Sequence, residues 1–247
     1  DLTYASAGGA GLLGLGWDLP TDSIERMTSR GLPDYDGDDL FAANGGNQLT
    51  RVGDGEPAVY RARNEGGFVR YKWFRRTEPR NDYWTAEYPD GRVAYFGATA
   101  AGIVAPGARL DGDLGTFRYG MVDTADAFGH RIRYDWQRFG GTSLPVRVSW
   151  VFDGQTPRFK VEFQYEGRPD HISDCKPRFC EVVEHRLSEL HVFSIGARIA
   201  RWTFEYEEED ATGGLSRLAR VTQYGLNGER YPARFTFAYS KSLGGVC

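Results

Sequence analysis

The chain alternates between apolar and polar residues with a period of two along most of its length. Stretches such as VRYKWFRR at 69–76 and RFKVEFQY at 158–165 place charged side chains between aromatic residues and valine. Because successive side chains of a strand point to opposite faces, this pattern predicts half-buried antiparallel strands with one wet face. The same alternation recurs at 82–88, 92–97, 130–136, 145–152, 197–206, 217–225 and 233–240.

Turn residues separate these runs at short intervals. Pro89-Asp90-Gly91 and Asn227-Gly228 each lie between two alternating stretches, and FDGQTP at 152–157 does the same. Such sequences favour hairpin turns because they supply the backbone conformations that tight turns need. We therefore predict an all-β fold, an extended antiparallel sheet of hairpins with a sandwich or barrel-like arrangement and little helix.

Two stretches depart from this simple pattern. EVVEHRLSELHVF at 181–193 admits a helix, but it alternates in part and lacks a capping residue, so we predict a strand. The glycine- and alanine-rich stretch at 98–113 is expected to be a surface loop, since the strand pattern continues on both sides of it.

Composition supports a globular β protein. Of the 247 residues, 40% are hydrophobic and 14% aromatic, and 32 are glycine, which suits half-buried strands joined by tight turns. The net charge of −4 provides no positive field for nucleic acid, and no apolar run approaches the length of a membrane span. Because the chain opens on Asp1 without a methionine, we expect residues 1–247 to form one domain within a longer protein.

The stretch GAGLLG at 9–14 matches the glycine pattern of dinucleotide-binding folds. That pattern works when its last glycine begins a helix whose N-terminus holds the pyrophosphate. Here Gly16 and Pro20 follow closely and would break such a helix. We therefore predict a tight turn in which glycines allow close backbone approach, with Trp17 buried as its anchor.

The stretch DYDGDDLF contains three carboxylates with the spacing of a calcium loop. Asp34, Asp36 and Asp38 occupy alternate positions, but the glycine and glutamate that an EF-hand loop requires are replaced by Asp39 and Gly45. A looser calcium site at Asp34, Asp36 and Asp38 is one interpretation. A polar turn that leads into the next strand is the other.

Cysteine and histidine gather between residues 171 and 185. His171, Cys175, Cys180 and His185 supply zinc-type ligands, but their spacing fits no common zinc finger. A disulfide that closes the loop between Cys175 and Cys180, or two free thiols, are simpler interpretations. Cys247 is the third cysteine.

Catalytic motifs are weak in this chain. Glu207-x-Glu209 has the spacing of the catalytic carboxylates in ADP-ribosyltransferases, but their arginine strand and Ser-Thr-Ser element are not recognisable, so an acidic surface turn is preferred. The chain has four histidines and lacks a G-x-S-x-G motif. We predict that this chain is not an enzyme.

The first forty residues together resemble the SpvB/TcaC N-terminal domain family. The family pattern contains a glycine-rich block that ends in Gly-Trp, an Ile-x-Arg strand, a Gly-x-Pro turn, then Asp and Phe. YPDGRVAYFG, DAFGHRIRYDW and GGLSRLARVTQYG fit its later hairpins, so the resemblance extends over nearly the whole chain. The matching residues are Tyr4, Gly9, Gly11, Gly14, Gly16, Trp17, Ile24, Arg26, Gly31, Pro33, Asp39 and Phe41.

The resemblance implies a function without catalysis. In toxin complexes this domain belongs to a β-strand shell that, together with RHS-repeat regions, encloses a toxic C-terminal polypeptide. The expected partners are therefore the RHS-repeat or C-component polypeptide, the translocation subunit and the rest of the same chain. The resemblance also implies an RHS-like shell segment and a secreted bacterial protein, with delivery to the host cytoplasm as a further expectation. The ADP-ribosyltransferase activity of the Salmonella relative belongs to a separate C-terminal domain.

Two features fall outside what the family explains. Cys175 and Cys180 stand where relatives carry other residues, which favours a local disulfide particular to this lineage.

The alternative function is a glycan- or calcium-binding adhesion module, based on the aromatic strand faces and the Asp34–Asp39 loop.

Overall fold

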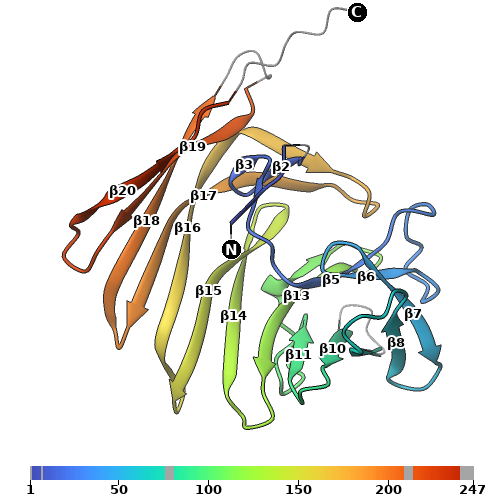
Figure 1. Cartoon of the computed structure of the whole chain (residues 1–247). Coiled ribbons are helices and arrows are strands. Elements are labelled where there is room, and N and C mark those ends of the chain that lie inside the picture. Colours follow the sequence, from blue (N-terminus) through green and yellow to red (C-terminus); the bar gives the residue numbers. More distant parts are fainter. Residues whose placement is uncertain (1, 7, 76–80, 209–213, 240–247) are drawn as a thin grey trace, which may run out of the picture. The chain divides into compact units, whose positions relative to one another are not determined.

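The computed structural model describes residues 2–6, 8–75, 81–208 and 214–239 (Figure 1). These residues form twenty strands and one short 3₁₀ turn, η1 at Pro106–Ala108. The all-β prediction is confirmed, and the ambiguous stretch at 181–193 lies in strand β17 (Glu181–Ser194). No helix in this described part of the chain has the length and apolar character that crossing a bilayer requires.

The chain divides into two compact units. The first unit comprises residues 1–20, 159–172 and 183–247, and the second comprises residues 21–158 and 173–182. The long strand β16 (Thr156–Asp174) and strand β17 contribute residues to both units.

A closed ring of antiparallel strands forms most of the second unit. Each strand from β5 to β11 pairs with the next, and β13 then pairs with both β11 and β5, which closes the circuit and removes the open edges of the sheet. The predicted barrel-like arrangement is therefore present in this unit. Its strands are β5 (Ser23–Arg26), β6 (Phe41–Ala43), β7 (Asn47–Gly53), β8 (Ala58–Ala62), β9 (Arg70–Phe74), β10 (Tyr83–Glu87), β11 (Val93–Phe96), β12 (Arg109–Asp111), β13 (Thr116–Ala125), β14 (Arg131–Phe139) and β15 (Thr142–Asp153).

Strand β13 closes the ring because it is long enough to change partners along its length. It pairs with β5 at Arg118–Gly120 and with β14 at Asp123–Ala125, while β12 and then β11 accompany it as well. The amide of Met121 donates to the Asp22 carbonyl, and the carbonyl of Gly120 accepts from the Gly97 amide. Since neighbouring residues of a strand direct their hydrogen bonds to opposite edges, β5 and β11 flank β13 on different sides.

Aromatic side chains fill the interior of the ring. Phe41 packs with its ring centroid 4.8 Å from Trp84 and 5.1 Å from Trp73, and the two tryptophans stack. Ile24 and Tyr119 are also fully buried in this core. Trp73 and Trp84 belong to the alternating runs at 69–76 and 82–88, whose apolar positions face inward as predicted.

The first unit is an open antiparallel sheet with a short glycine-rich segment on it. Its sheet follows the order β16, β17, β18 (Ala197–Glu208), β19 (Ser216–Tyr224) and β20 (Arg230–Thr236). A core around Leu13, Leu187 and Leu218 joins the glycine-rich segment to this sheet. The small strands of that segment are β1 (Thr3–Tyr4), β2 (Ala10–Gly11), β3 (Gly14–Leu15) and β4 (Trp17–Asp18).

The glycines at the start of the chain allow close backbone packing. A Cβ atom on Gly11 would lie 2.4 Å from the Trp17 carbonyl oxygen, and one on Gly14 would lie 2.5 Å from the Ser216 carbonyl oxygen. Residues 10–18 form three short strands, so the helix that a pyrophosphate site needs is missing from this described segment. Trp17 is half-buried and not fully buried as predicted, and its indole Nε1 donates to the Tyr239 hydroxyl at 2.9 Å.

Candidate functional site

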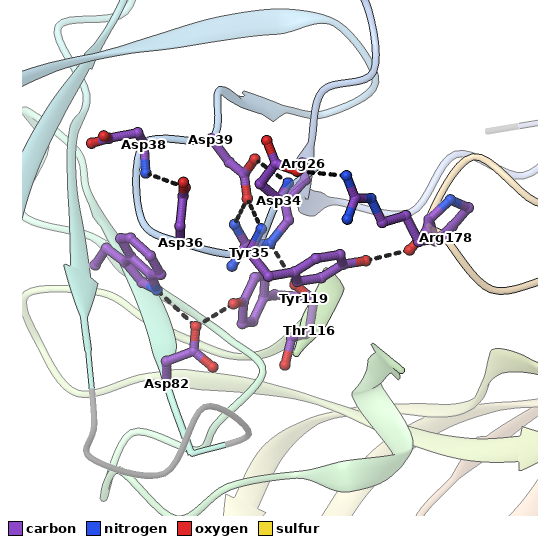
Figure 2. Close-up of polar contacts among 12 residues, drawn as sticks. Arg26, Asp34, Tyr35, Asp36, Asp38, Asp39, Asp82, Thr116, Tyr119 and Arg178 are labelled. Carbon is purple, nitrogen blue, oxygen red and sulfur yellow. Dashed lines mark hydrogen bonds and ion pairs between the residues drawn. The ribbon is translucent and has the colours of Figure 1, made fainter. Parts of the chain in front are cut away.

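The Asp34–Asp39 loop lies between β5 and β6, and its hydrogen bonds converge on the carboxylate of Asp39 (Figure 2). The carboxylate of Asp39 accepts hydrogen bonds from the backbone amides of Asp34 at 2.9 Å and Tyr35 at 2.8 Å. It also forms an ion pair with Arg26, and both side chains are largely buried. Asp39 therefore fixes the loop from within through charge-assisted hydrogen bonds.

The three predicted calcium ligands have separate contacts in this loop. Asp34 accepts a hydrogen bond from the Arg178 guanidinium at 2.5 Å, and Asp36 accepts one from the Asp38 backbone amide at 3.0 Å. Figure 2 shows the carboxylates of Asp34 and Asp38 pointing in different directions. Among the described residues, no group of three or more acidic, histidine or cysteine side chains could hold a metal ion. Calcium binding by Asp34, Asp36 and Asp38 stays a prediction, and Arg178 already contacts one carboxylate oxygen of Asp34.

The loop closed by Cys175 and Cys180 lies against the Asp34–Asp39 loop. The structure places a disulfide between the two cysteines, so neither sulfur remains as a thiolate ligand for zinc. Within this disulfide loop, Arg178 pairs with Asp34, and the carbonyl of Pro177 accepts a hydrogen bond from the Tyr35 hydroxyl at 2.6 Å. Two candidate regions that are far apart in the sequence are therefore neighbours in the second unit. Cys247 and Glu209 lie outside the described residues.

Tyr35 connects the Asp34–Asp39 loop to the buried side chain of Arg26. Its backbone has a φ of 61°, a conformation that few residues other than glycine adopt. The Arg26 guanidinium lies over its ring at 4.7 Å. Burial, opposed by Arg26 and reinforced by Asp39, raises the pKa of Tyr35 to about 12, so its hydroxyl remains a hydrogen-bond donor at neutral pH.

Arg26 connects the Asp34–Asp39 loop to the ring of strands. Its Nε donates to the carbonyl of Thr116 at 2.9 Å, and its guanidinium lies 4.9 Å from the centre of the Phe41 ring. The aromatic rings and the carboxylate attract the guanidinium, and this attraction offsets the free-energy cost of removing its charge from water.

Asp82 and Arg109 form a second buried pair inside the ring. Arg109 is fully buried and donates to the Asp82 carboxylate at 3.1 Å and to the Asp82 carbonyl at 2.9 Å. The other carboxylate oxygen of Asp82 accepts from the Trp73 indole at 2.9 Å and from the Tyr119 hydroxyl. Burial and the nearby charge of Asp82 raise the pKa of Tyr119 well above its ordinary value.

Protein donors thus occupy both carboxylate oxygens of Asp82. Thr116 completes the arrangement, since its hydroxyl donates to Asp111 at 2.7 Å and contacts Arg109. A general base or nucleophile needs a lone pair that faces a substrate. The cluster therefore has the features of a structural polar network, which ties β9, β12 and β13 together inside the ring.

Arg109 was missed by the sequence analysis, and the surface-loop prediction for 98–113 is correct for the largely exposed stretch 99–103 but wrong for Ala98 and for 108–111. Ala98, Ala108 and Leu110 are buried with Arg109, and strand β12 lies within the stretch. A stretch rich in glycine and alanine can lie in an exposed loop or pack closely in the interior, and its composition alone does not distinguish these two cases. Arg26, by contrast, belongs to the Ile-x-Arg element of the family pattern.

A further buried ion pair lies in the first unit. The Arg168 guanidinium forms two hydrogen bonds with the Asp170 carboxylate, at 3.0 and 2.7 Å, and donates to the Gly11 carbonyl at 3.0 Å. Asp170 also accepts from the Ser216 amide at 2.8 Å and the Ser216 hydroxyl at 2.5 Å. This cluster fastens the glycine-rich segment to strands β16 and β19.

Solved structures define the class of protein that has this fold. The N-terminal domain of effector protein SpvB from Salmonella typhimurium strain LT2 matches with a TM-score of 0.77 and 20% identity, over 91% of this chain and 92% of that chain. The Tc holotoxin pore of Photorhabdus luminescens matches with a TM-score of 0.84 and 18% identity, over 96% of this chain but 14% of that one. The fold is thus that of an effector N-terminal domain and of a segment of a much larger toxin subunit.

The chain belongs to the SpvB family. The family profile, described as Salmonella virulence plasmid 65kDa B protein, matches residues 1–147. The mono(ADP-ribosyl)transferase SpvB of Salmonella typhimurium is 31% identical over 121 residues, which cover 40% of this chain and 20% of that relative. The resemblance inferred from the Gly-Trp block is therefore confirmed, and this match reaches only about a fifth of the relative's length.

Proposed function

We propose that this chain is a non-catalytic shell and delivery domain of a secreted bacterial toxin. Within a longer polypeptide it would help to encapsulate or translocate a toxic C-terminal segment. Its partners would be the RHS-repeat or C-component polypeptide, a translocation subunit of the toxin complex and the rest of its own chain. The mature protein would act outside the bacterium, with delivery into the host cytoplasm as a further step.

The observation that carries this proposal is the extent of the structural match. Almost all of this chain, 96%, aligns with a segment that makes up 14% of a Tc holotoxin chain. In that protein the same fold is one part of a large assembly. Membership of the SpvB family and the match to an effector N-terminal domain support the same interpretation.

The open edge of the first unit also supports it. Among the described residues, β20 pairs with β19 alone, so its other side presents unpaired amides and carbonyls. Tyr231 is 50% exposed and Phe235 is 65% exposed on this strand. Since a free apolar edge promotes unwanted pairing, proteins normally cover or charge such strands. We propose that a later strand of the longer polypeptide covers β20.

The absence of catalysis in this chain is part of the proposal. The matched relative is named as an ADP-ribosyltransferase, but the alignment covers a fifth of it. The buried carboxylates Asp39, Asp82 and Asp170 are each held by arginine and by other protein donors. We therefore assign any transferase activity of the full-length protein to a different segment.

Protease protection in the full-length protein tests the proposal. We expect the C-terminal polypeptide to resist limited proteolysis when it is attached to this domain and its neighbours, because a closed shell excludes the protease. The substitution Phe235→Glu, on the β20 edge, is expected to expose that polypeptide to cleavage. Phe128→Glu provides the control, since Phe128 is 86% exposed on a hairpin of the second unit. Cleavage of the C-terminal polypeptide at the same rate with and without this domain would contradict the proposal.

A further inference from the structure

The second unit contains a pocket of about 590 Å³ at the point where β13 changes partners. On one edge of β13 the partner changes from β5, which pairs as far as Gly120, to β14, which pairs from Asp123 onward, and the Met121 amide between them donates to the Asp22 carbonyl. Asp22, just before β5, and Tyr134, on β14, line the hollow beside this change of partner. The volume lies within the range of about 300–1,000 Å³ that is typical of small-molecule sites.

Aromatic side chains form much of the pocket wall. Tyr88 follows β10, Tyr134 lies on β14, and Trp150 and Phe152 lie on β15. All four are half-buried rather than sealed in the core. Aromatic rings that remain accessible in a concave site offer flat apolar surfaces to a ligand.

Three polar groups in the pocket lack a protein partner. Among the described residues, no hydrogen bond or ion pair engages the Asp22 carboxylate or the hydroxyls of Tyr88 and Tyr134. Desolvation by the surrounding walls raises the pKa of Asp22, against the opposing effect of Arg92. All three groups line the same pocket, and the charge of Asp22 adds to the larger effect of burial in raising the pKa of both tyrosines.

The charges around the pocket balance. Asp22 and Asp126 face Arg92 and Arg131 among the lining residues. Asp126 is already engaged, because it accepts from the His130 ring at 2.8 Å and from two amides of its own turn. Arg92 lies 4.2 Å above the Tyr88 ring, and its Nε is 3.9 Å from Asp90, beyond hydrogen-bond distance. The lining of the pocket therefore has no net excess of either charge.

We propose that this pocket binds an uncharged sugar ring. The C–H face of such a ring packs on an aromatic wall, and its hydroxyls donate to the Asp22 carboxylate and accept from Arg92 and the tyrosine hydroxyls. The ligand thus offers an apolar face to the aromatic wall and hydrogen-bond partners to the polar groups that lack one in the protein. This activity goes beyond the proposed shell function, because it requires neither an enclosed polypeptide nor a covered β20 edge.

Calorimetry with the protein and defined oligosaccharides tests this proposal. The neutral probes are lactose, N-acetyllactosamine, cellobiose and chitobiose, and the charged comparators are sialyllactose and a heparin disaccharide. We expect at least one neutral probe to bind and the comparators to bind more weakly. Asp22→Ala should raise its Kd about tenfold, since a hydrogen bond to a charged group is lost. Tyr134→Phe, which removes only a hydroxyl, should raise it by about threefold or more.

Matched controls separate the pocket from the general surface. Asp153→Ala removes an exposed carboxylate next to the pocket wall, and Phe128→Ala removes an exposed aromatic side chain of the adjoining hairpin. Both variants should bind like the parent protein. The proposal is overturned if no neutral probe binds at millimolar concentration, if only the charged comparators bind, or if Asp22→Ala and Tyr134→Phe bind as tightly as the controls.

Discussion

Replacing Asp82 by alanine should lower the free energy of unfolding of the second unit by about 3–5 kcal/mol, because it removes one of the two carboxylate partners of the buried Arg109 and leaves the Trp73 and Tyr119 donors without an acceptor. Arg109 is fully buried, and Asp82 receives hydrogen bonds from Arg109, Trp73 and Tyr119. The substitution therefore removes the acceptor of the Trp73 and Tyr119 donors, whereas Arg109 keeps the Asp111 carboxylate at 3.3 Å. Urea denaturation followed by tryptophan fluorescence measures the change, since Trp73 and Trp84 report on this core.

Two further variants identify the cause of that loss. Asp153→Ala removes a mostly exposed carboxylate that lies 3.3 Å from the Arg158 guanidinium, so we expect a change of less than about 0.5 kcal/mol. Combining Asp82→Leu with Arg109→Met removes both charges and should recover part of the stability. A loss of less than about 1 kcal/mol in the free energy of unfolding for Asp82→Ala would contradict this account, because the buried Asp82–Arg109 pair would then not stabilise the ring.

Replacing Asp170 by asparagine should destabilise the first unit at neutral pH and reduce its sensitivity to acid. Burial alone would raise the pKa of Asp170, but hydrogen bonds from Arg168 and Ser216 outweigh it and hold the pKa well below its ordinary value. A carboxyl with a lowered pKa in the folded state stabilises the fold above its unfolded pKa of about 3.9, and this contribution disappears as the pH falls through the folded pKa.

The expected result is a loss of about 3 kcal/mol at pH 7 for Asp170→Asn, since Arg168 stays fully buried without its counter-charge. The difference between parent and variant should shrink as the pH is lowered below about 4. Thermal unfolding at several pH values measures both effects, with Asp153→Asn as an exposed control. If the difference between parent and variant remained constant down to acid pH, Asp170 would not be the acid-sensitive group.

The strands were predictable from sequence because the alternation is a local property. Hairpin turns were equally local: Gly91 and Gly228 have the positive φ angles of 85° and 75° that their turn sequences favour. The pairing of β11 with β13 was not predictable, since closure depends on the register and twist of a whole series of strands. The division into two compact units likewise follows from packing between segments that are distant in the sequence.

The candidate site was partly visible in the sequence. The spacing rule for calcium selected Asp34, Asp36 and Asp38, but the loop is organised around Asp39, whose ion pair with Arg26 no spacing rule identifies. Contact between the Asp34–Asp39 loop and the disulfide loop spans 142 residues from Tyr35 to Pro177. Arg109 was hidden for a different reason, because its glycine- and alanine-rich surroundings resemble those of an exposed connection.

Hydrogen exchange at β20 tests the shell proposal most directly. The measurement compares the backbone amides of Arg230–Thr236 in the isolated 247-residue chain and in the full-length protein that contains it. We predict that the amides on the open side of β20 exchange at least about tenfold more slowly in the full-length protein, because a further strand pairs with that edge. Equal exchange rates in the two proteins would mean that the edge stays open, and this would contradict the assignment of the chain as a segment of a closed shell.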